Sequence, residues 1–277
     1  MNWFTETSET AQGRQVQVAY TKKLDSFQSG FQQIEVYETV SFGKMLVLDG
    51  AIQLTAYDHF AYHEMIVHVP MNVHPDPKHV LIVGGGDGGA LAEVVKYPTV
   101  ETIVLCEIDK AVIELSRKHF PEFNKAFDDK RVTVNIGDAA EYIKKKANAF
   151  DVIIIDSSDP IGPAEVLFGK TFYRDVFLAL TAEGIAVSQS ESMYYHRDFI
   201  AKLFHQNKAI FPINEYYFTL VPTYPSGTIG FSFCSKLREP VDKIAPHRIE
   251  GLAGLRYYSE AIHRSCFVLP AFFDRNN

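Results

Sequence analysis

Two aspartates, Asp156 and Asp159, flank a pair of serines directly after the apolar run 152–155. A carboxylate at the end of a buried strand can hold an ammonium group and accept its proton, which a general base does when an amine must become a nucleophile. The segment 160–163, rich in Pro and Gly, predicts a loop that covers this slot. Because Asp, Ser, Pro and Gly are also common turn residues, an ordinary turn is the alternative interpretation.

A glycine-rich turn, residues 84–89, follows the apolar run 80–83 and precedes an expected helix over 88–96. Its glycines fit the pattern G-x-G-x-x-G of nucleotide-binding units. Asp87 inside the turn would repel a pyrophosphate, with no Lys or Arg nearby to compensate. The turn therefore favours a nucleoside that carries a sulfonium or an amine and no phosphate. A turn that only packs helix against strand is the alternative, although that packing does not require five glycines.

Carboxylates also follow the neighbouring strands expected at 101–106 and 131–136. In open α/β sheets, ligands bind at the carboxyl ends of the strands, so these acids should converge with those above. Glu107, about twenty residues beyond the glycine turn, stands where a ribose-binding acid belongs. Asp138 alone is equally well explained as a helix cap.

Two domains must position these residues. Strands and helices alternate from 79 to 208, which predicts a Rossmann-like, mostly parallel sheet with helices on both faces. An antiparallel strand pair, 214–221 and 228–235, should close this sheet. Before it, the predicted strands 15–22, 31–39, 45–48 and 51–54, with Asp49-Gly50 as a hairpin turn, indicate a small antiparallel β-domain. A helix over 57–69, ended by Pro70, joins the two, and we place the domains at 1–56 and 57–277.

Composition limits the partners. The chain has 277 residues, 47% of them hydrophobic, and a formal net charge of −7. Without a basic cluster beyond 144–146, we expect no nucleic-acid partner. Three cysteines without C-x-x-C spacing predict reduced thiols, and the lack of a leader or a long apolar run predicts a cytoplasmic protein without membrane contact. His59 and His63 have zinc-like spacing, but no third ligand follows in sequence, so we predict no metal.

Several motifs together resemble one family. They are Tyr62-His-Glu-Met65, the glycine turn, Glu107-Ile-Asp109, Asp156-Ser-Ser-Asp-Pro160 and Pro222-Thr-Tyr-Pro-Ser-Gly227. Spread over nearly the whole chain, they resemble the spermidine synthase family of polyamine aminopropyltransferases. The resemblance implies a methyltransferase-type α/β fold and transfer of an aminopropyl group from decarboxylated S-adenosylmethionine to putrescine, giving spermidine and methylthioadenosine. It implies no cofactor, since the donor is a co-substrate, and a homodimer or homotetramer.

The resemblance also implies roles for individual residues. The donor would be bound by Gln32, His63, Asp87, Glu107, Asp138, Ala139 and Pro163. Asp156 would be the proton acceptor, and the diamine would be bound by Tyr62, Asp156, Asp159, Gln189 and Tyr224.

Three alternatives stay open at this stage. The acceptor could be agmatine, cadaverine or a longer polyamine. The enzyme could instead be an amine N-methyltransferase that uses intact S-adenosylmethionine, although Asp87 would repel the carboxylate of that donor. The chain could also be a nucleoside-binding regulatory domain without catalysis, against which the base and covering loop at 156–164 argue.

Overall fold

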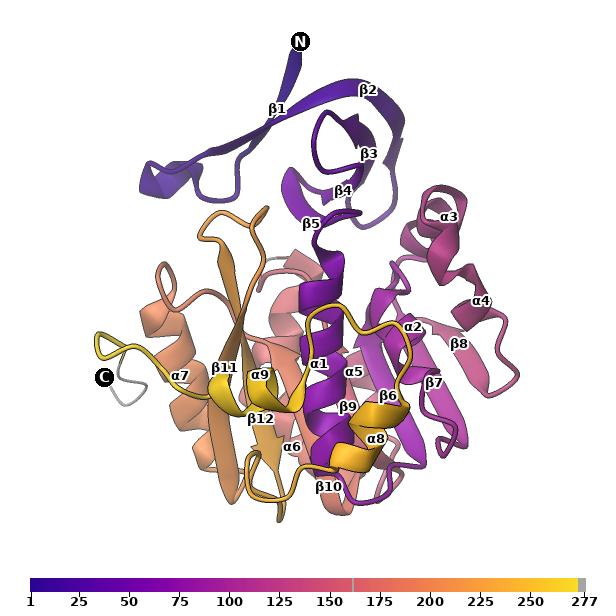
Figure 1. Cartoon of the computed structure of the whole chain (residues 1–277), viewed down its shortest axis with the longest axis vertical. Helices are drawn as coiled ribbons and strands as arrows, with labels where there is room; N and C mark the ends of the chain where they lie inside the picture. The colour runs from indigo at the N-terminus through magenta and orange to yellow at the C-terminus, as the bar shows by residue number, and fades with distance from the viewer. Residues whose placement is uncertain (161, 274–277) are drawn as a thin grey trace.

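The computed structural model describes residues 1–160 and 162–273 and contains two sheets (Figure 1). The N-terminal sheet has the antiparallel order β1-β2-β3-β4-β5, with β1 (Asn2–Glu6), β2 (Val16–Gln28), β3 (Gln33–Thr39), β4 (Lys44–Leu48) and β5 (Ala51–Thr55). Asp49 and Gly50 have φ values of 46° and 82°, as a type I′ turn requires, so the predicted hairpin is confirmed. β1, which pairs with β2, was not predicted.

The second sheet has seven strands in the order β11-β12-β10-β9-β6-β7-β8. Its strands are β6 (His79–Gly84), β7 (Thr102–Glu107), β8 (Val132–Ile136), β9 (Phe150–Asp156), β10 (Leu180–Gln189), β11 (Ile213–Leu220) and β12 (Thr228–Ser235). The strands from β8 to β10 are parallel, and β12 and β11 continue the sheet antiparallel. The predicted fold class is therefore confirmed.

Helices cover both faces of this sheet. Its helical segments are α1 (His59–Val73), α2 (Gly89–Val94), α3 (Lys110–His119), η2 (Pro121–Phe123), α4 (Asn124–Phe127), α5 (Ala139–Ile143), η3 (Gly162–Phe168), α6 (Lys170–Ala179), α7 (Arg197–Lys208), α8 (Pro246–Gly251) and α9 (Glu260–Ser265), and η1 (Thr10–Gln12) lies in the N-terminal domain. Val80 and Ile82 of β6 pack with α1 and α2, whereas Leu81 and Val83 pack with α5, α6 and α7. None of the helices in the described part of the chain has the length and apolar composition to cross a bilayer.

Helix α1 differs from the prediction because it continues past Pro70 to Val73. Proline lacks the N–H group that would bond to the carbonyl one turn earlier and costs about 3 kcal/mol inside a helix. Met71 and Val73 are buried beyond it, and every residue from 61 to 73 is buried. Burial on all sides outweighs the cost of the proline, so the sequence signal for a helix end was wrong here.

A buried glutamate fastens the C-terminal segment to α1. Glu64, 1% exposed, accepts hydrogen bonds from the backbone N–H groups of Arg256 (2.8 Å), Tyr257 (2.9 Å) and Tyr258 (2.7 Å). These residues lie between α8 and α9, which pass along α1 in Figure 1. One carboxylate on α1 thus holds a segment almost two hundred residues further along the chain.

Glu64→Gln should weaken folding without changing the shape of the side chain. The amide must turn an N–H group toward at least one of the three backbone donors, so a hydrogen bond to a charged acceptor, worth about 1.5–3 kcal/mol, is lost. Urea denaturation measures the change in the free energy of unfolding. Glu114→Gln, which removes the charge of an exposed residue paired with Lys110, is the control and should change little. Equal midpoints for the two variants would show that apolar contacts alone hold the C-terminal segment.

Candidate active site

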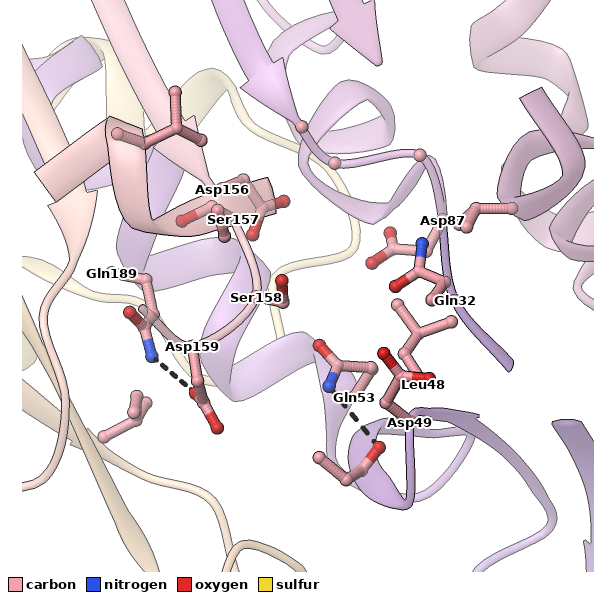
Figure 2. A pocket seen from close by; sticks show the side chains of 18 of the residues that line it. Gln32, Leu48, Asp49, Gln53, Asp87, Asp156, Ser157, Ser158, Asp159 and Gln189 are labelled. Atoms are coloured by element: carbon pink, nitrogen blue, oxygen red, sulfur yellow. Dashed lines mark hydrogen bonds between the residues drawn. The ribbon is translucent and has the colours of Figure 1, made fainter. Parts of the chain in front are cut away.

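A pocket of about 230 Å³ lies between the two sheets. Its floor comes from the carboxyl ends of the parallel strands, and the N-terminal domain supplies Gln32, Leu48, Asp49 and Gln53 on the opposite side (Figure 2). Both domains are therefore needed to enclose it.

The pocket is centred where the strand order reverses. From β6 the chain proceeds through β7 to β8 on one side, whereas β9 and β10 are added on the other. Gly84 and Asp156 are paired across β6 and β9, and the N–H group of Gly85 donates to the backbone carbonyl of Asp156 at 2.8 Å. Such switch points are the usual ligand sites of open α/β sheets. The last residue of β9 is thus joined to the glycine turn by the backbone itself.

The glycines of the turn make room for other side chains of the site. A Cβ atom on Gly84, whose φ is +74°, would lie 2.3 Å from the backbone oxygen of Asp156. A Cβ on Gly86 would lie 2.8 Å from an oxygen of Glu107, and one on Gly89 would lie 2.0 Å from the imidazole of His63. No larger residue fits these positions without moving the backbone at Asp156 or the side chain of Glu107 or His63.

Asp156 has one paired and one unpaired carboxylate oxygen. Its Oδ1 accepts a hydrogen bond from the hydroxyl of Tyr62 at 2.7 Å, whereas the buried Oδ2 has no partner among the described residues. Burial and then the charge of Asp87 raise the pKa of Asp156 to about 6, although His63 and the hydroxyl of Tyr62 oppose this shift. A carboxyl with a pKa close to neutral is suited to accepting a proton.

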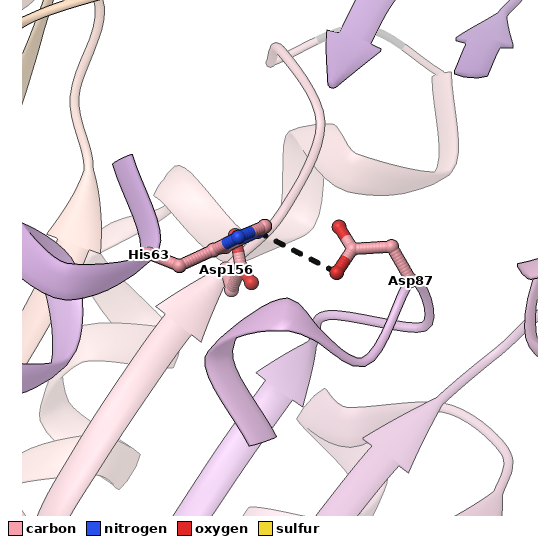
Figure 3. A group of neighbouring side chains, drawn as sticks. All are labelled: His63, Asp87 and Asp156. Carbon is pink, nitrogen blue, oxygen red and sulfur yellow. Dashed lines mark ion pairs between the residues drawn. The ribbon is translucent and has the colours of Figure 1, made fainter. Parts of the chain in front are cut away.

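His63 and Asp87 form a buried pair beside Asp156 (Figure 3). Nε2 of His63 lies 3.5 Å from Oδ1 of Asp87, which also accepts the N–H group of Gly89 at 2.5 Å. Burial, the largest single influence, lowers the pKa of His63, but the charge and hydrogen bond of Asp87 together with the charges of Asp156 and Glu93 outweigh it, and the net shift is upward. Burial raises the pKa of Asp87, but the charge and hydrogen bond of His63 help to keep the pKa of Asp87 below its usual value.

The structure changes the argument about metals. His63, Asp87 and Asp156 each offer a ligand atom, and these atoms lie within 4.8 Å of one another. The sequence argument assumed that no further ligand accompanies the histidines. That assumption is wrong in the folded structure, because two strand ends bring carboxylates close to His63. Three such groups suit a cation of any kind, including an organic one, and the absence of a resident metal stays a prediction.

Glu107 lies at the end of β7 with both oxygens directed at backbone donors. Oε1 accepts from the N–H group of Asp109 at 2.8 Å and Oε2 from that of Gly86 at 3.1 Å. Burial nevertheless raises the pKa of Glu107 to about 7. Nearby, the side-chain amide of Gln32 donates to Asp109 at 3.1 Å, and Asp138 caps α5 by accepting from Ala140 at 2.7 Å. Asp138 is therefore a helix cap that also lines the pocket.

The other end of the pocket is also acidic. The side-chain amide of Gln189 donates to Asp159 at 3.4 Å, and the hydroxyl of Tyr224 donates to the backbone oxygen of Gln53 at 2.7 Å. Burial, and then the charges of Glu191 and Glu6, raise the pKa of Asp159 to about 7.

Sequence reasoning missed several residues of this end. Glu6, Glu9, Glu191 and His196 also line the pocket. Glu6 belongs to the unpredicted strand β1, and Glu9 reaches His196 across the domains at 2.8 Å. Glu191 lies two residues beyond the end of β10, so the rule that acids at strand ends converge could have found it.

The structure brings nearly all predicted site residues together. Those lining the pocket are Gln32, Tyr62, His63, Asp87, Glu107, Asp138, Ala139, Asp156, Asp159, Gln189 and Tyr224. The side chain of Pro163 lies outside what the structure describes, although its backbone belongs to η3. Their individual roles stay predictions.

Comparisons with known proteins cover almost the whole chain. The family model described as the spermine/spermidine synthase domain matches residues 59–243, and that described as the spermidine synthase tetramerisation domain matches residues 2–56. A polyamine aminopropyltransferase of Leptospira biflexa is 49% identical over 270 residues, 98% of this chain and 96% of that protein. A spermidine synthase of Dictyostelium discoideum is 47% identical over 273 residues, 98% of this chain and 95% of that protein.

Solved structures give the same result. A spermidine synthase in complex with the transition-state analogue AdoDATO superposes with a TM-score of 0.94 at 38% identity, covering 98% of this chain and 93% of the other. The spermidine synthase from Thermotoga maritima has a TM-score of 0.93 at 38% identity, covering 98% and 92%. The resemblance inferred from the motifs is confirmed: the chain belongs to the spermine/spermidine synthase family and is a polyamine aminopropyltransferase.

Proposed function

We propose that this enzyme transfers the aminopropyl group of decarboxylated S-adenosylmethionine to putrescine, with Asp156 as the general base. The observation that carries the proposal is the buried Oδ2 of Asp156, which has no hydrogen-bond partner within residues 1–160 and 162–273 and lies at the strand switch point between the acids of the two ends of the pocket. The amine nitrogen forms a bond to the carbon next to the sulfonium as the carbon–sulfur bond breaks. Methylthioadenosine leaves, and Asp156 takes the proton of the amine.

A base is needed because the acceptor is charged in water. Alkyl ammonium groups have a pKa of about 10, so very little free amine exists at neutral pH. Burial and Asp87 raise the pKa of Asp156 to about 6, which reduces the difference between its pKa and that of the ammonium. The neighbouring sulfonium reduces this difference further, since a second cation lowers the pKa of the ammonium. Proton transfer to Asp156 thereby becomes less unfavourable.

The donor fits the end of the pocket formed by the glycine turn. Asp87 attracts its aminopropyl ammonium and sulfonium, and Glu107 is placed to accept hydrogen bonds from the ribose hydroxyls. Gln32 from the N-terminal sheet and Ala139 at the start of α5 border the same end. This end offers carboxylates and backbone groups for a cationic nucleoside that has no phosphate.

The acceptor fits the opposite end. Tyr62, Gln189 and Tyr224 supply polar and aromatic walls there, and Asp159 offers a carboxylate for the ammonium that does not react. Putrescine is the acceptor that the family resemblance implies, and the alternatives are agmatine, cadaverine and a longer polyamine. Incubation with the decarboxylated donor and each amine, with product masses, identifies the preferred one.

The proposal extends to assembly. Residues 2–56 match a tetramerisation domain, so we propose a homo-oligomer, a dimer or a tetramer, in which the N-terminal sheets take part. The reaction as proposed needs no cofactor or metal, because the leaving group is already a sulfonium.

Asp156→Asn should retain nucleoside binding and lose turnover. The amide keeps the shape and the Tyr62 contact but cannot accept the proton, and loss of general-base catalysis costs about 100- to 10,000-fold. Methylthioadenosine release measures turnover, and calorimetric titration with methylthioadenosine measures binding. Asp198→Asn, at an exposed position on α7, is the matched control. Near-native turnover of Asp156→Asn would exclude Asp156 as the base.

Tyr62→Phe should move the acid side of the pH–kcat profile. Asp156 acts only when ionised, so turnover falls as the pH decreases through its pKa, about 6 when its burial and its neighbours are intact. The hydroxyl of Tyr62 lowers that pKa, and its removal should shift the fall in kcat to higher pH. Tyr142→Phe, outside the pocket, serves as the reference. An unmoved profile would mean that another group controls the acid side.

Asp87→Asn should change the preference between donors. It removes an attraction for the decarboxylated donor and a repulsion against the carboxylate of intact S-adenosylmethionine, so the two affinities should move in opposite directions. Each shift should be about fivefold or more, because charge-assisted contacts are strong in a partly desolvated site. Competition binding checks this, with uncharged methylthioadenosine as the control ligand. Equal losses for both donors would show that Asp87 only shapes the turn.

A further inference from the structure

Two histidine rings, one helical turn apart on α1, face each other through the same kind of nitrogen. Nδ1 of His59 lies 3.2 Å from Nδ1 of His63. At this distance one nitrogen must carry a proton and the other a lone pair, because two N–H groups would collide and two lone pairs would repel. The protonation of one ring therefore depends on that of the other.

The second nitrogen of His63 is also occupied. Nε2 faces Oδ1 of Asp87 at 3.5 Å (Figure 3), and Nδ1 faces His59, so His63 has acceptors on both sides. An imidazole donates from both nitrogens only when it is protonated. His59 is the neutral acceptor of this pair, because burial and then His63 lower its pKa to about 3.

The electrostatic surroundings of the pair are set by several elements. The charged groups that act on it are Asp87 in the glycine turn, Glu93 on α2, Asp156 at the end of β9 and Arg256 in the C-terminal segment, and the ring of Tyr62 on α1 contacts His63. The carboxylates favour a protonated His63 as long as no other cation is present. A cationic donor beside Asp87 takes the place of that charge, and the imidazolium then becomes unfavourable.

His63 itself is 2% exposed, whereas His59 is partly exposed. A proton that leaves His63 at Nδ1 therefore reaches His59 first. His59 can accept it there while its Nε2 proton passes to solvent. Both rings end neutral, with His59 donating to Nδ1 of His63 and His63 keeping its proton on Nε2 toward Asp87. One proton is released, and the hydrogen bond between the rings is kept with its direction reversed.

We propose that His59 is a positioning residue that, as the hydrogen-bond acceptor at Nδ1, keeps His63 protonated until the cationic donor binds beside Asp87 and one proton is released to solvent; we call this release the relay. The inference rests on the proposed donor, and it makes the affinity for that donor depend on pH. Donor binding and proton release are linked, so the affinity should rise as the pH increases, by at most about tenfold per pH unit for one proton.

The test counts the protons released on binding. Calorimetric titrations in two buffers of different ionisation enthalpy are made at neutral pH with decarboxylated S-adenosylmethionine and with methylthioadenosine, which lacks both the sulfonium and the ammonium. The number of protons released by methylthioadenosine is subtracted from the number released by the decarboxylated donor. This subtraction removes protons linked to binding of the nucleoside itself, such as those of Glu107. Repeating the titrations in the Asp156→Asn background removes any proton released by Asp156.

Two substitutions examine His59 in these backgrounds. His59→Phe keeps the aromatic contact with Phe123, whose ring centroid lies 5.1 Å away, but cannot accept a hydrogen bond. Without an acceptor for the proton on Nδ1 the protonated form of His63 is less favoured, so the cationic donor should release fewer extra protons than from the native enzyme and the affinity should depend less on pH. His59→Asn, whose amide can accept or donate, should retain much of both effects.

The outcomes are distinct. If His59→Phe releases as many extra protons as the native enzyme, or if His59→Asn behaves like His59→Phe, the relay is wrong and His59 only packs against its neighbours. If neither nucleoside binds the native enzyme, the proposed function fails and the relay with it. Binding of both nucleosides with equal proton counts in the native enzyme overturns the relay alone.

Discussion

The glycine turn at residues 84–89 has no room for a side chain at Gly84, Gly86, Gly88 or Gly89, and at three of these positions that lack of room shapes the site. Added Cβ atoms at Gly84, Gly86 and Gly89 would meet Asp156, Glu107 and His63 at 2.0–2.8 Å. The turn therefore lets Asp156, Glu107 and the imidazole of His63 approach its backbone closely. Only glycine permits this approach, and one of the three positions also needs a positive φ.

Holding several acids around one small pocket carries an electrostatic cost. Asp156, Asp159 and Glu107 have pKa values raised to between about 6 and 7, in each case through burial first. Ionised acids in such a site repel one another, and a bound cation stabilises them because it favours the ionised form of its neighbours. The same surplus of negative charge thus favours the binding of cationic ligands.

Segments far from the parallel sheet complete the site. The N-terminal sheet covers the pocket with Gln32 and Gln53, and Tyr224 on the opposite loop is tied to Gln53 by its hydroxyl. Helix α1 joins the two domains and carries Tyr62 and His63 into the site, while Glu64 on the same turn anchors the C-terminal segment. Because these side chains are consecutive on one helix, the turn of α1 that holds the C-terminal segment also carries the Tyr62 contact with Asp156.

The sequence by itself determined the elements and the end of the sheet where chemistry occurs. Alternating strands and helices, acids after successive strands and Asp87 within the glycine turn sufficed for this, because period and strand-end position are local properties. It failed where burial decides: Pro70 does not end α1, and β1 was missed together with Glu6.

Only the tertiary structure decided which groups touch. The contacts of Tyr62 with Asp156 and of Glu9 with His196 join residues far apart in the chain, and no spacing rule contains them. The pKa of each acid likewise follows from burial and from neighbouring charges that the fold brings together, so the sequence could name the carboxylates while their protonation required the packed molecule.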